Sequence, residues 1–481
     1  MEGLFPSVRI IDPRVLFDDI RFYINKRREG LLNMLKVKNF FKGKRNDISI
    51  FNSIFMLLLL YSMVRRMALG YTKEDWNIAE WLINYRGGFV RRGLTGQALF
   101  DLYNHFGLSP YTVILLISGL AFVGLAVFFV INFRKKGLSL SILLYPFFLG
   151  GLIINNIWAR KDVVIVLIFI LLIYLVTENF PTSKKTGTGI LKLFALNVAF
   201  SLGLLIHEEL GFLAFPILFL IFFNSLKERF STIKCVLLSI LKLIPSLIIF
   251  PLCVYYKGSV TASNLIWNSW KPVPFPFQDM SAVPPSAIDA LSWSLQRGLS
   301  LTVDTIKNFD GGIYAPIAWV LIIAVIFYLL SHLNIYNSEE TKVTNNEKTN
   351  QYTKTNISSI LIFQLLFIIP LFILGWDYAR WIFLWVTTSF SLLILLPDEK
   401  LATLFPKFLV HFSEKVDCFL SSIFRSIRSR ESYFIVLLFL GVPSYSWTLE
   451  EYTHSTPIYF VIANISNFIY MIGKAVIPLV K

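Results

Sequence analysis

The chain has few charged residues and very few cysteines. Only 16% of its 481 residues are Asp, Glu, Lys or Arg, and its three cysteines form no CxxC pair. A disulfide framework and a cysteine metal site are therefore excluded. A zinc-binding HExxH motif is absent at His207, because Gly211 stands where its second histidine would be. The first 47 residues also lack the apolar core of a cleavable signal peptide.

What the chain has instead is apolar sequence in long runs. Hydrophobic residues make up 55% and aromatic residues 16% of it. Runs of about 20 apolar residues predict membrane-spanning helices, so the fold class is all-α, a polytopic helical membrane protein with about 12 transmembrane helices. We predict spans at residues 48–64, 111–133, 138–157, 163–176, 190–206, 210–223, 235–255, 315–333, 357–374, 381–396, 433–445 and 458–476.

Lys and Arg near span ends stay in the cytoplasm, which orients the helices. The basic segment 1–47 is predicted to be cytoplasmic, and residues 48–333 form a transmembrane bundle with external loops 65–110 and 256–314. A flexible cytoplasmic linker, 334–356, precedes C-terminal transmembrane helices at 357–481 with an amphipathic cytoplasmic segment at 401–430. The net charge of +15 is therefore a signal of topology and indicates no nucleic-acid partner.

Four polar clusters fall on the external side under this topology. Charge inside a membrane is costly, so clusters that share one side indicate one site. The clusters are Tyr85 to Arg92, Arg160-Lys161-Asp162, His207-Glu208-Glu209 and Asp377 to Trp381. Their basic residues violate the inside rule and outnumber the nearby acids, so we expect an anionic ligand to balance them.

The first cluster lies in external loop 65–110. The residues around Trp76 and Trp81 predict a short interfacial helix, and a second helix is expected to begin at Arg92-Gly93 and to run towards Asp101. Backbone N–H groups at that helix start, beside Arg86, Arg91 and Arg92, would cradle a phosphate or pyrophosphate. The alternative is a basic anchor that touches lipid phosphates.

The third cluster, between two apolar runs, must face a polar cavity at least in part. A carboxylate against an apolar wall has a raised pKa, which suits a general base, so Glu208 is the first candidate and His207 its partner. The alternative is a buried His–Glu pair that joins neighbouring spans.

Two further clusters have both a structural and a functional interpretation. Arg160, Lys161 and Asp162 either close a helix hairpin with an ion pair or bind the ligand. Asp377 and Arg380 lie three residues apart on one helix face, where Asp377 either caps the helix or joins the site. In loop 256–314, residues such as Trp267, Trp270 and Trp293 indicate either a sugar-stacking lid or an interfacial loop.

These clusters together resemble a group of bacterial multi-pass proteins from surface-polysaccharide gene clusters. In layout the chain is also similar to the GT-C superfamily of membrane glycosyltransferases and to O-antigen polymerases. The GT-C resemblance implies a catalytic acid in the first external loop, where Glu74 and Asp75 occupy a compatible place and Glu80 is a third option. It also implies external interfacial helices.

The resemblance implies sugar transfer or polymerisation from a polyprenyl-(pyro)phosphate donor to a glycan acceptor at the external face of the bacterial inner membrane. Phosphate would be held by Arg86, Arg91, Arg92, Arg160, Lys161 and Arg380, with Asp377, and a carboxylate would act as base. No cofactor or metal is required, although a divalent cation remains an option, and other polysaccharide-assembly proteins are possible partners. The alternatives are a flippase for lipid-linked sugars and an acyl transferase that uses His207.

Overall fold

A computed structural model describes residues 46–73, 75–177, 186–276, 283–308, 314–333, 347–375, 377–427, 429–444 and 448–476. The chain divides into two units, 1–53 and 54–481, and the account below concerns the second. Helix α3 (Asn46–Leu69) contains the boundary. In these ranges every regular element is a helix and none is a strand, which confirms the all-α prediction.

Seven helices are long and apolar enough to cross a membrane, which supports the membrane class. They are α3, α6 (Pro110–Lys135), α9 (Thr186–Ile206), α11 (Thr232–Tyr255), α15 (Tyr314–Ser331), α17 (Glu347–Leu374) and α18 (Tyr378–Leu395). Each coincides with a predicted span. The count of twelve is not confirmed, and neither the GT-C layout nor the side on which the N-terminus lies is established.

Two further predicted spans form helices that are short for a bilayer. Helix α8 (Asp162–Thr177) has 16 residues and α10 (Leu210–Leu226) has 17. At 1.5 Å per residue each extends roughly 25 Å, below the ~30 Å of a hydrocarbon core. Helix α21 (Arg430–Phe439), at the eleventh predicted span, has only 10 residues. The last predicted span corresponds to α23 (Pro457–Val476).

The predicted span at 138–157 is not one continuous helix. It consists of a 3-10 helix, η2 (Leu140–Leu144), and a short α7 (Leu149–Ile154). The chain doubles back between them, so that a Cβ atom at Gly150 would collide with the carbonyl oxygen of Leu144, and one at Gly151 with that of Pro146. Glycine permits this close backbone approach.

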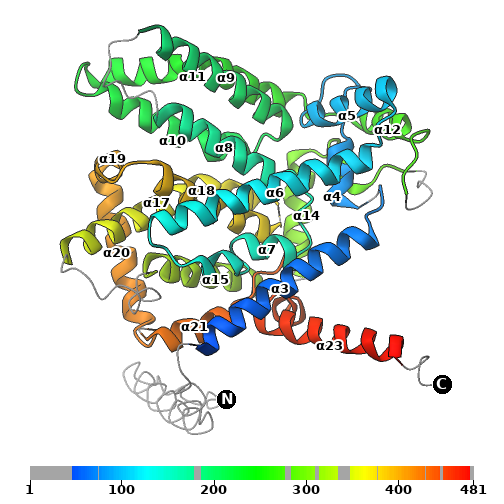
Figure 1. Ribbon diagram of the computed structural model, residues 1–481. Coiled ribbons are helices and arrows are strands. Elements are labelled where there is room, and N and C mark those ends of the chain that lie inside the picture. Colours follow the sequence, from blue (N-terminus) through cyan, green and yellow to red (C-terminus); the bar gives the residue numbers. More distant parts are fainter. Residues whose placement is uncertain are drawn as a thin grey trace, which may run out of the picture. The chain divides into compact units, whose positions relative to one another are not determined.

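Helix α8 lies at the centre of the bundle. It packs against α6, α9, α10 and α18, while α17 packs against α15, α18 and α20 (Lys407–Ile423), as Figure 1 shows. Helix α18 is buried on all sides despite several hydroxyl side chains. The hydroxyls of Thr387, Thr388 and Ser389 each donate to a carbonyl oxygen four residues earlier, at 2.6 to 2.7 Å, so their burial leaves no donor unpaired.

The polar clusters lie at one end of this bundle. Arg380 in the first turn of α18 meets Asp162, the first residue of α8, at 2.8 Å. At the other ends of α6 and α18, Lys136 and Asp398 form an ion pair of 3.0 Å. The sequence order of the helices therefore brings the predicted external residues together and separates them from Lys136.

The predicted external loop 65–110 is folded against the helix bundle. It contains α4 (Trp76–Ala79), the 3-10 helix η1 (Glu80–Leu82) and α5 (Gly93–Phe106). The two predicted helices are thus present. Ile78, Trp81 and Leu82 are buried, so Trp81 does not anchor the first helix among lipid headgroups, whereas Trp76 is partly exposed. An interfacial position of this helix stays a prediction.

Loop 256–314, the second predicted external loop, packs against loop 65–110. It contains α12 (Val260–Trp270), α13 (Ser286–Asp289) and α14 (Leu295–Asn308). Trp267 and Trp270 are fully buried, and the Trp270 indole donates to the carbonyl oxygen of Leu82 at 2.6 Å. Neither can stack on a sugar or rest in the membrane interface, so both interpretations of these two tryptophans are wrong.

The structures predicted for residues 334–356 and 401–430 are met in part, and their cytoplasmic location stays a prediction. Helix α17 begins at Glu347, so the end of the predicted linker 334–356 is helical, and residues 334–346 lie outside the described ranges. Segment 401–430 holds most of α19 (Asp398–Leu404) and all of α20. On α20, Leu409 and Leu420 are buried while His411 and Glu414 are exposed, as an amphipathic helix requires. Phe408, Phe412 and Phe419 are exposed as well. Another short helix, α22 (Leu449–His454), precedes α23.

Gly96 sets how closely α5 approaches the preceding loop. A Cβ atom there would collide with the carbonyl oxygen of Ile83. We expect Gly96→Ala to lower the free energy of unfolding by about 1–3 kcal/mol through overpacking. Gly119→Ala in α6, where nothing lies within 4 Å of the added carbon, is the matched control. Chemical unfolding in detergent would measure both, and equal effects would contradict the close packing.

Candidate functional site

The first acidic residue of the site along the chain is Glu80, which lies on η1 and is buried. It is 1% exposed, receives the Arg160 guanidinium at 3.1 Å and accepts the backbone N–H of Lys161 at 3.0 Å. Burial would raise its pKa, but the charges of Arg160, Arg380 and Lys161 outweigh burial and lower the pKa to about 2. Glu80 is therefore ionised and ties the first external loop to the turn before α8.

Arg380 joins three carboxylates. Its guanidinium lies 2.8 Å from Asp162, 2.7 Å from Asp377 and 3.5 Å from Glu209. Asp377 precedes α18 but makes no capping hydrogen bond with its side chain. It pairs instead with Arg380 and lies 3.6 Å from Arg160, and these two arginines lower its pKa although burial opposes them. The side-chain cap offered as one interpretation of Asp377 is therefore wrong, because its carboxylate pairs with Arg380 instead.

Arg91 and Arg92 converge on Glu208. Arg92, held in a left-handed conformation (φ 64°) before α5, makes a forked contact through Nε at 2.9 Å and Nη2 at 2.6 Å. Arg91 adds a contact at 3.3 Å. Burial would raise the pKa of Glu208, but Arg92 and Arg91 hold it well below the usual carboxyl range. The predicted raised proton affinity of Glu208 is therefore wrong, because the loop that carries the arginines folds onto it.

The carboxylate with the raised pKa is Glu209, the next residue in the chain. Burial, and then the charge of Asp162, raise the pKa of Glu209 to about 8. Glu209 is 1% exposed, and neither carboxyl oxygen has a hydrogen-bond partner within the described part of the chain. At neutral pH Glu209 therefore carries a proton.

His207 is neutral beside it. Burial, and then the charge of Arg92, lower its pKa well below the usual value. The backbone N–H of Glu209 donates to Nδ1 of His207 at 3.3 Å, which places the ring proton on Nε2. The carboxyl of Glu209 lies 3.5 Å from the same Nδ1. The predicted buried His–Glu pair is thus present, but with Glu209 closer than Glu208, which is 3.9 Å away.

Lys161 is buried and links the loop before α5 to the end of α9. Its ammonium donates to the carbonyl oxygens of Arg92 at 3.2 Å and of Ile206 at 3.5 Å, and it lies over the ring of Trp81. Burial lowers the pKa of Lys161 to about 7, so its charge is easily lost. A lysine held by two backbone carbonyls fixes the ends of α9 and of the loop before α5 relative to each other.

Ten ionisable residues thus form one cluster, called the ion network below. Its acidic residues are Glu80, Asp162, Glu208, Glu209 and Asp377, and its basic residues are Arg91, Arg92, Arg160, Lys161 and Arg380. Glu80 and Glu208 balance part of the basic charge that the sequence left without partners, and an anionic ligand for the rest stays a prediction. Residues from all four predicted clusters meet here, and the first cluster contributes only Arg91 and Arg92.

Two predicted site residues, Arg86 and Asp75, stand apart from the network. Arg86 is exposed and lies over the ring of Phe100. Asp75 pairs with Arg66 at 3.8 Å and accepts the backbone N–H of Thr72. Glu74 lies outside the described residues. Whether any of these binds or transforms a ligand stays a prediction.

Sequence reasoning missed the central place of Glu80. A carboxylate between Ala79 and Trp81 is unusual in a buried stretch, and that neighbourhood is the signal that could have identified it. Lys73 was missed as well, and its ammonium donates to the carbonyl oxygen of Trp270 at 3.1 Å. Among the described residues, no group of three or more His, Cys, Asp or Glu side chains is placed to hold a metal ion.

The protonated carboxyl of Glu209 predicts a pH dependence. Between its ordinary pKa of 4.5 and about 8, the folded chain holds a proton that the unfolded chain has released. The free energy of unfolding therefore falls as pH rises through this window, by at most about 1.4 kcal/mol per pH unit. Glu209→Gln removes this contribution to the pH dependence of stability. His207 and Lys161 contribute in both the wild type and the variant.

The measurement is the difference in stability between the wild type and Glu209→Gln, by chemical unfolding in detergent from pH 5 to pH 8. We expect the advantage of the wild type to shrink steadily with rising pH. A difference that stays constant over the whole range would show that Glu209 keeps an ordinary pKa.

The fold and the site define a class, an all-helical membrane protein whose buried charges gather at one end of its bundle. No protein-family model, no curated protein and no solved structure matches the chain. The interpretation of the site therefore depends on its own geometry.

Proposed function

We propose that the protein is a membrane glycosyltransferase or polysaccharide polymerase that uses polyprenyl-(pyro)phosphate-linked sugars. It would act at the external face of the bacterial inner membrane and transfer sugar to a glycan acceptor. The observation that carries the proposal is the pairing of Glu208 with Arg91 and Arg92, a carboxylate held by two cations that also suit a phosphate.

Exposure divides the ion network into a rim and a base. The side chains of Arg91 and Arg92 are 25% and 21% exposed and that of Glu208 is 10%, whereas Asp162 and Arg380 are at most 3% exposed. A substrate reaches the rim first. We assign binding and chemistry to the rim, to exposed Arg86 and to Asp377, whose side chain is 26% exposed, and we assign positioning of the loops to Arg160, Lys161 and Arg380.

The substrate phosphate would compete with Glu208 for the arginines. Guanidinium groups bind carboxylate and phosphate with the same forked geometry. When Arg91 and Arg92 turn to the phosphate, Glu208 loses the charges that hold its pKa down, and its burial then raises the pKa. Donor binding would thus convert an inert carboxylate into a base.

The transfer step follows from that exchange. The acceptor hydroxyl attacks the anomeric carbon of the donor sugar and gives its proton to Glu208. The bond between that carbon and the phosphate oxygen breaks, and its electron pair leaves on the phosphate. Arg91 and Arg92 neutralise the developing charge. Asp75 is the alternative base, as the GT-C resemblance implies.

Arg92 provides the test of this function. Purified protein in nanodiscs would be given a polyprenyl-pyrophosphate-linked oligosaccharide, and lengthening or sugar transfer would be followed by gel and mass spectrometry. We expect Arg92→Ala to lower the rate by about 10²-fold or more. Arg92→Lys keeps a charge beside Glu208 but loses the fork, so it should fold and still be slow.

Arg297→Ala is the matched control, because the Arg297 side chain is 55% exposed, lies 3.8 Å from Asp289 and over the ring of Trp293, and contacts no residue of the ion network in the described part of the chain. It should transfer sugar at the wild-type rate. Full activity of both Arg92 variants would remove the phosphate-binding role from the rim.

A flippase for the same lipids is the second candidate. Proline lies inside α10, α11 and α17, at Pro216, Pro245, Pro251 and Pro370. Proline bends membrane helices and is common where helices move during transport. This candidate requires movement of the intact donor across a bilayer, without a change in its mass.

A further inference from the structure

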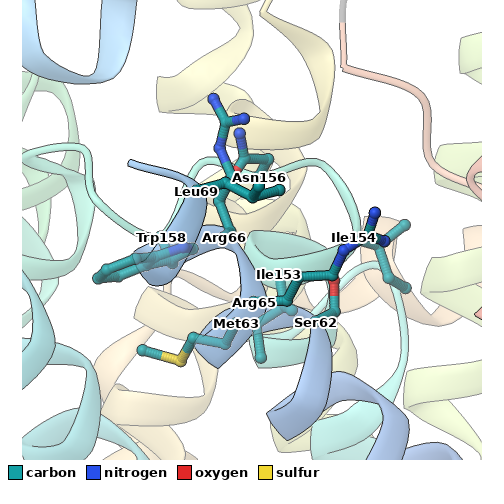
Figure 2. A pocket seen from close by; sticks show the side chains of 9 residues that line it. All are labelled: Ser62, Met63, Arg65, Arg66, Leu69, Ile153, Ile154, Asn156 and Trp158. Carbon is teal, nitrogen blue, oxygen red and sulfur yellow. The ribbon is translucent and has the colours of Figure 1, made fainter. Parts of the chain in front are cut away.

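A cavity outside the ion network lies beside the end of α3. Its volume is about 260 Å³, and Ser62, Arg65, Arg66, Leu69, Ile153 and Trp158 are among the residues that line it. Figure 2 shows the two arginines on α3 and Trp158 on the facing segment. Because liquid water occupies about 30 Å³ per molecule, the cavity has room for a small polar group with some hydrocarbon.

Two donors at this cavity have no partner. Arg66 Nε and Trp158 Nε1 are buried and make no hydrogen bond within the described part of the chain. Trp158 is fully buried, so its indole N–H cannot be satisfied by bulk solvent. A buried donor without a partner destabilises the fold, and a ligand with acceptor oxygens would supply the missing hydrogen bond.

The charge of the lining has one sign. Arg65 and Arg66 both contribute to it, and no carboxylate is among the described residues that line the cavity. The nearest ion-pair partner of Arg66 is Asp75, at 3.8 Å and outside the lining. Arg66 thus has one long carboxylate contact and lies over the ring of Tyr71, while the lining itself holds two cations, so an anion fits the cavity.

Apart from Ser62 and Asn156, the rest of the lining is apolar, and part of it is exposed. Met63, Ile153 and Ile154 line the cavity, and Leu69, which also lines it, is 59% exposed. Helix α3 is long enough to span a membrane, and Arg65 and Arg66 lie near its end. Arginines at that depth meet the layer of lipid headgroups.

We propose that this cavity is a binding site for the phosphate group of a membrane lipid, held by Arg65, Arg66 and the Trp158 indole. The hydrocarbon of the lipid would leave the cavity past Leu69. The site is separate from the ion network and does not depend on sugar transfer, although a polyprenyl phosphate belongs to this class of ligand.

The test measures binding to the full chain in detergent. Native mass spectrometry would follow titration with dioctanoyl phosphatidic acid, with dioctanoyl glycerol as the phosphate-free twin and inorganic phosphate as competitor. We expect one tightly bound phosphatidic acid and no retained dioctanoyl glycerol. Trp158→Phe keeps the ring and removes the N–H, and Arg66→Gln removes the charge, so each should weaken binding about tenfold or more.

Trp319→Phe is the matched control, since the Trp319 indole is also without a hydrogen bond within the described residues but lies on α15. It should bind like the wild type. Arg65→Gln is a second charge variant that leaves the contact between Arg66 and Asp75 intact. If inorganic phosphate at equal concentration displaces phosphatidic acid, the phosphate site is supported, and its ligand is the free phosphate ion. Wild-type affinity in all three site variants would overturn the proposal.

Discussion

Replacing Arg380 by methionine is expected to lower the free energy of unfolding by about 3–5 kcal/mol, the typical result of removing one partner from a buried charge pair. Arg380 is 3% exposed and its guanidinium contacts Asp162, Asp377 and Glu209. Methionine fills similar space, so the loss comes from Asp162 and Asp377, which would keep only the more distant contacts with Arg160 at 3.8 Å and 3.6 Å. Chemical unfolding in detergent micelles would measure it.

Two variants separate this effect from a general loss of charge. Arg134→Met removes an exposed arginine from the last turn of α6 and should change stability little. The double variant Arg380→Met with Asp162→Asn removes both members of the 2.8 Å pair and should recover part of the loss. An Arg380→Met protein as stable as Arg134→Met would show that the ion network does not hold the bundle end together.

The second large effect concerns activity. Glu208→Gln is expected to lower the rate of sugar transfer by about 10²- to 10⁴-fold, the contribution of a positioned general base. The amide can still accept hydrogen bonds from Arg92, which contacts Glu208 at 2.6 Å, so the loop should keep its place. The measurement is the initial rate of lengthening in nanodiscs at saturating donor.

Glu209→Gln is the matched control on the adjacent residue. With a pKa of about 8, Glu209 is already protonated at neutral pH, and glutamine resembles that form. Its rate at pH 7 should therefore stay close to the wild-type rate. The reverse result, an inactive Glu209→Gln beside an active Glu208→Gln, would move the base to Glu209.

The positions of the helices could be predicted from sequence because hydrophobic burial in a membrane is a local property. Helices α8 and α10 lie within a few residues of the predicted spans, as their apolar runs require. The broken segment of η2 and α7 was predicted as one helix. Pro146 and the pair Gly150-Gly151 were the available signal, since both residue types interrupt helices.

The location of the site could be predicted from the sequence, but its individual ion pairs could not. Topology predicted that the polar clusters would share one side of the bundle. Only Asp377 and Arg380 are close enough in sequence for their contact to be predicted from helix geometry. Arg380 and Asp162 are 218 residues apart, and Arg92 and Glu208 are 116 apart, so these contacts depend on tertiary packing.

That packing also explains the error about Glu208. Sequence showed its apolar neighbours and hence a raised pKa, but not the two arginines that the first external loop brings to it. Burial and opposite charge act in opposite directions on a carboxylate, and only the geometry decides which is larger.

Sealed vesicles that contain the purified wild type and its Glu208→Gln variant provide the most direct test of the central claim, that this site makes a glycosidic bond. A labelled polyprenyl-pyrophosphate oligosaccharide would be supplied on one face, and both the mass and the location of the label would be followed. We predict a product of higher mass with the wild type and none with Glu208→Gln. Transfer of unchanged donor to the other face, with no new bond in either protein, would contradict the account.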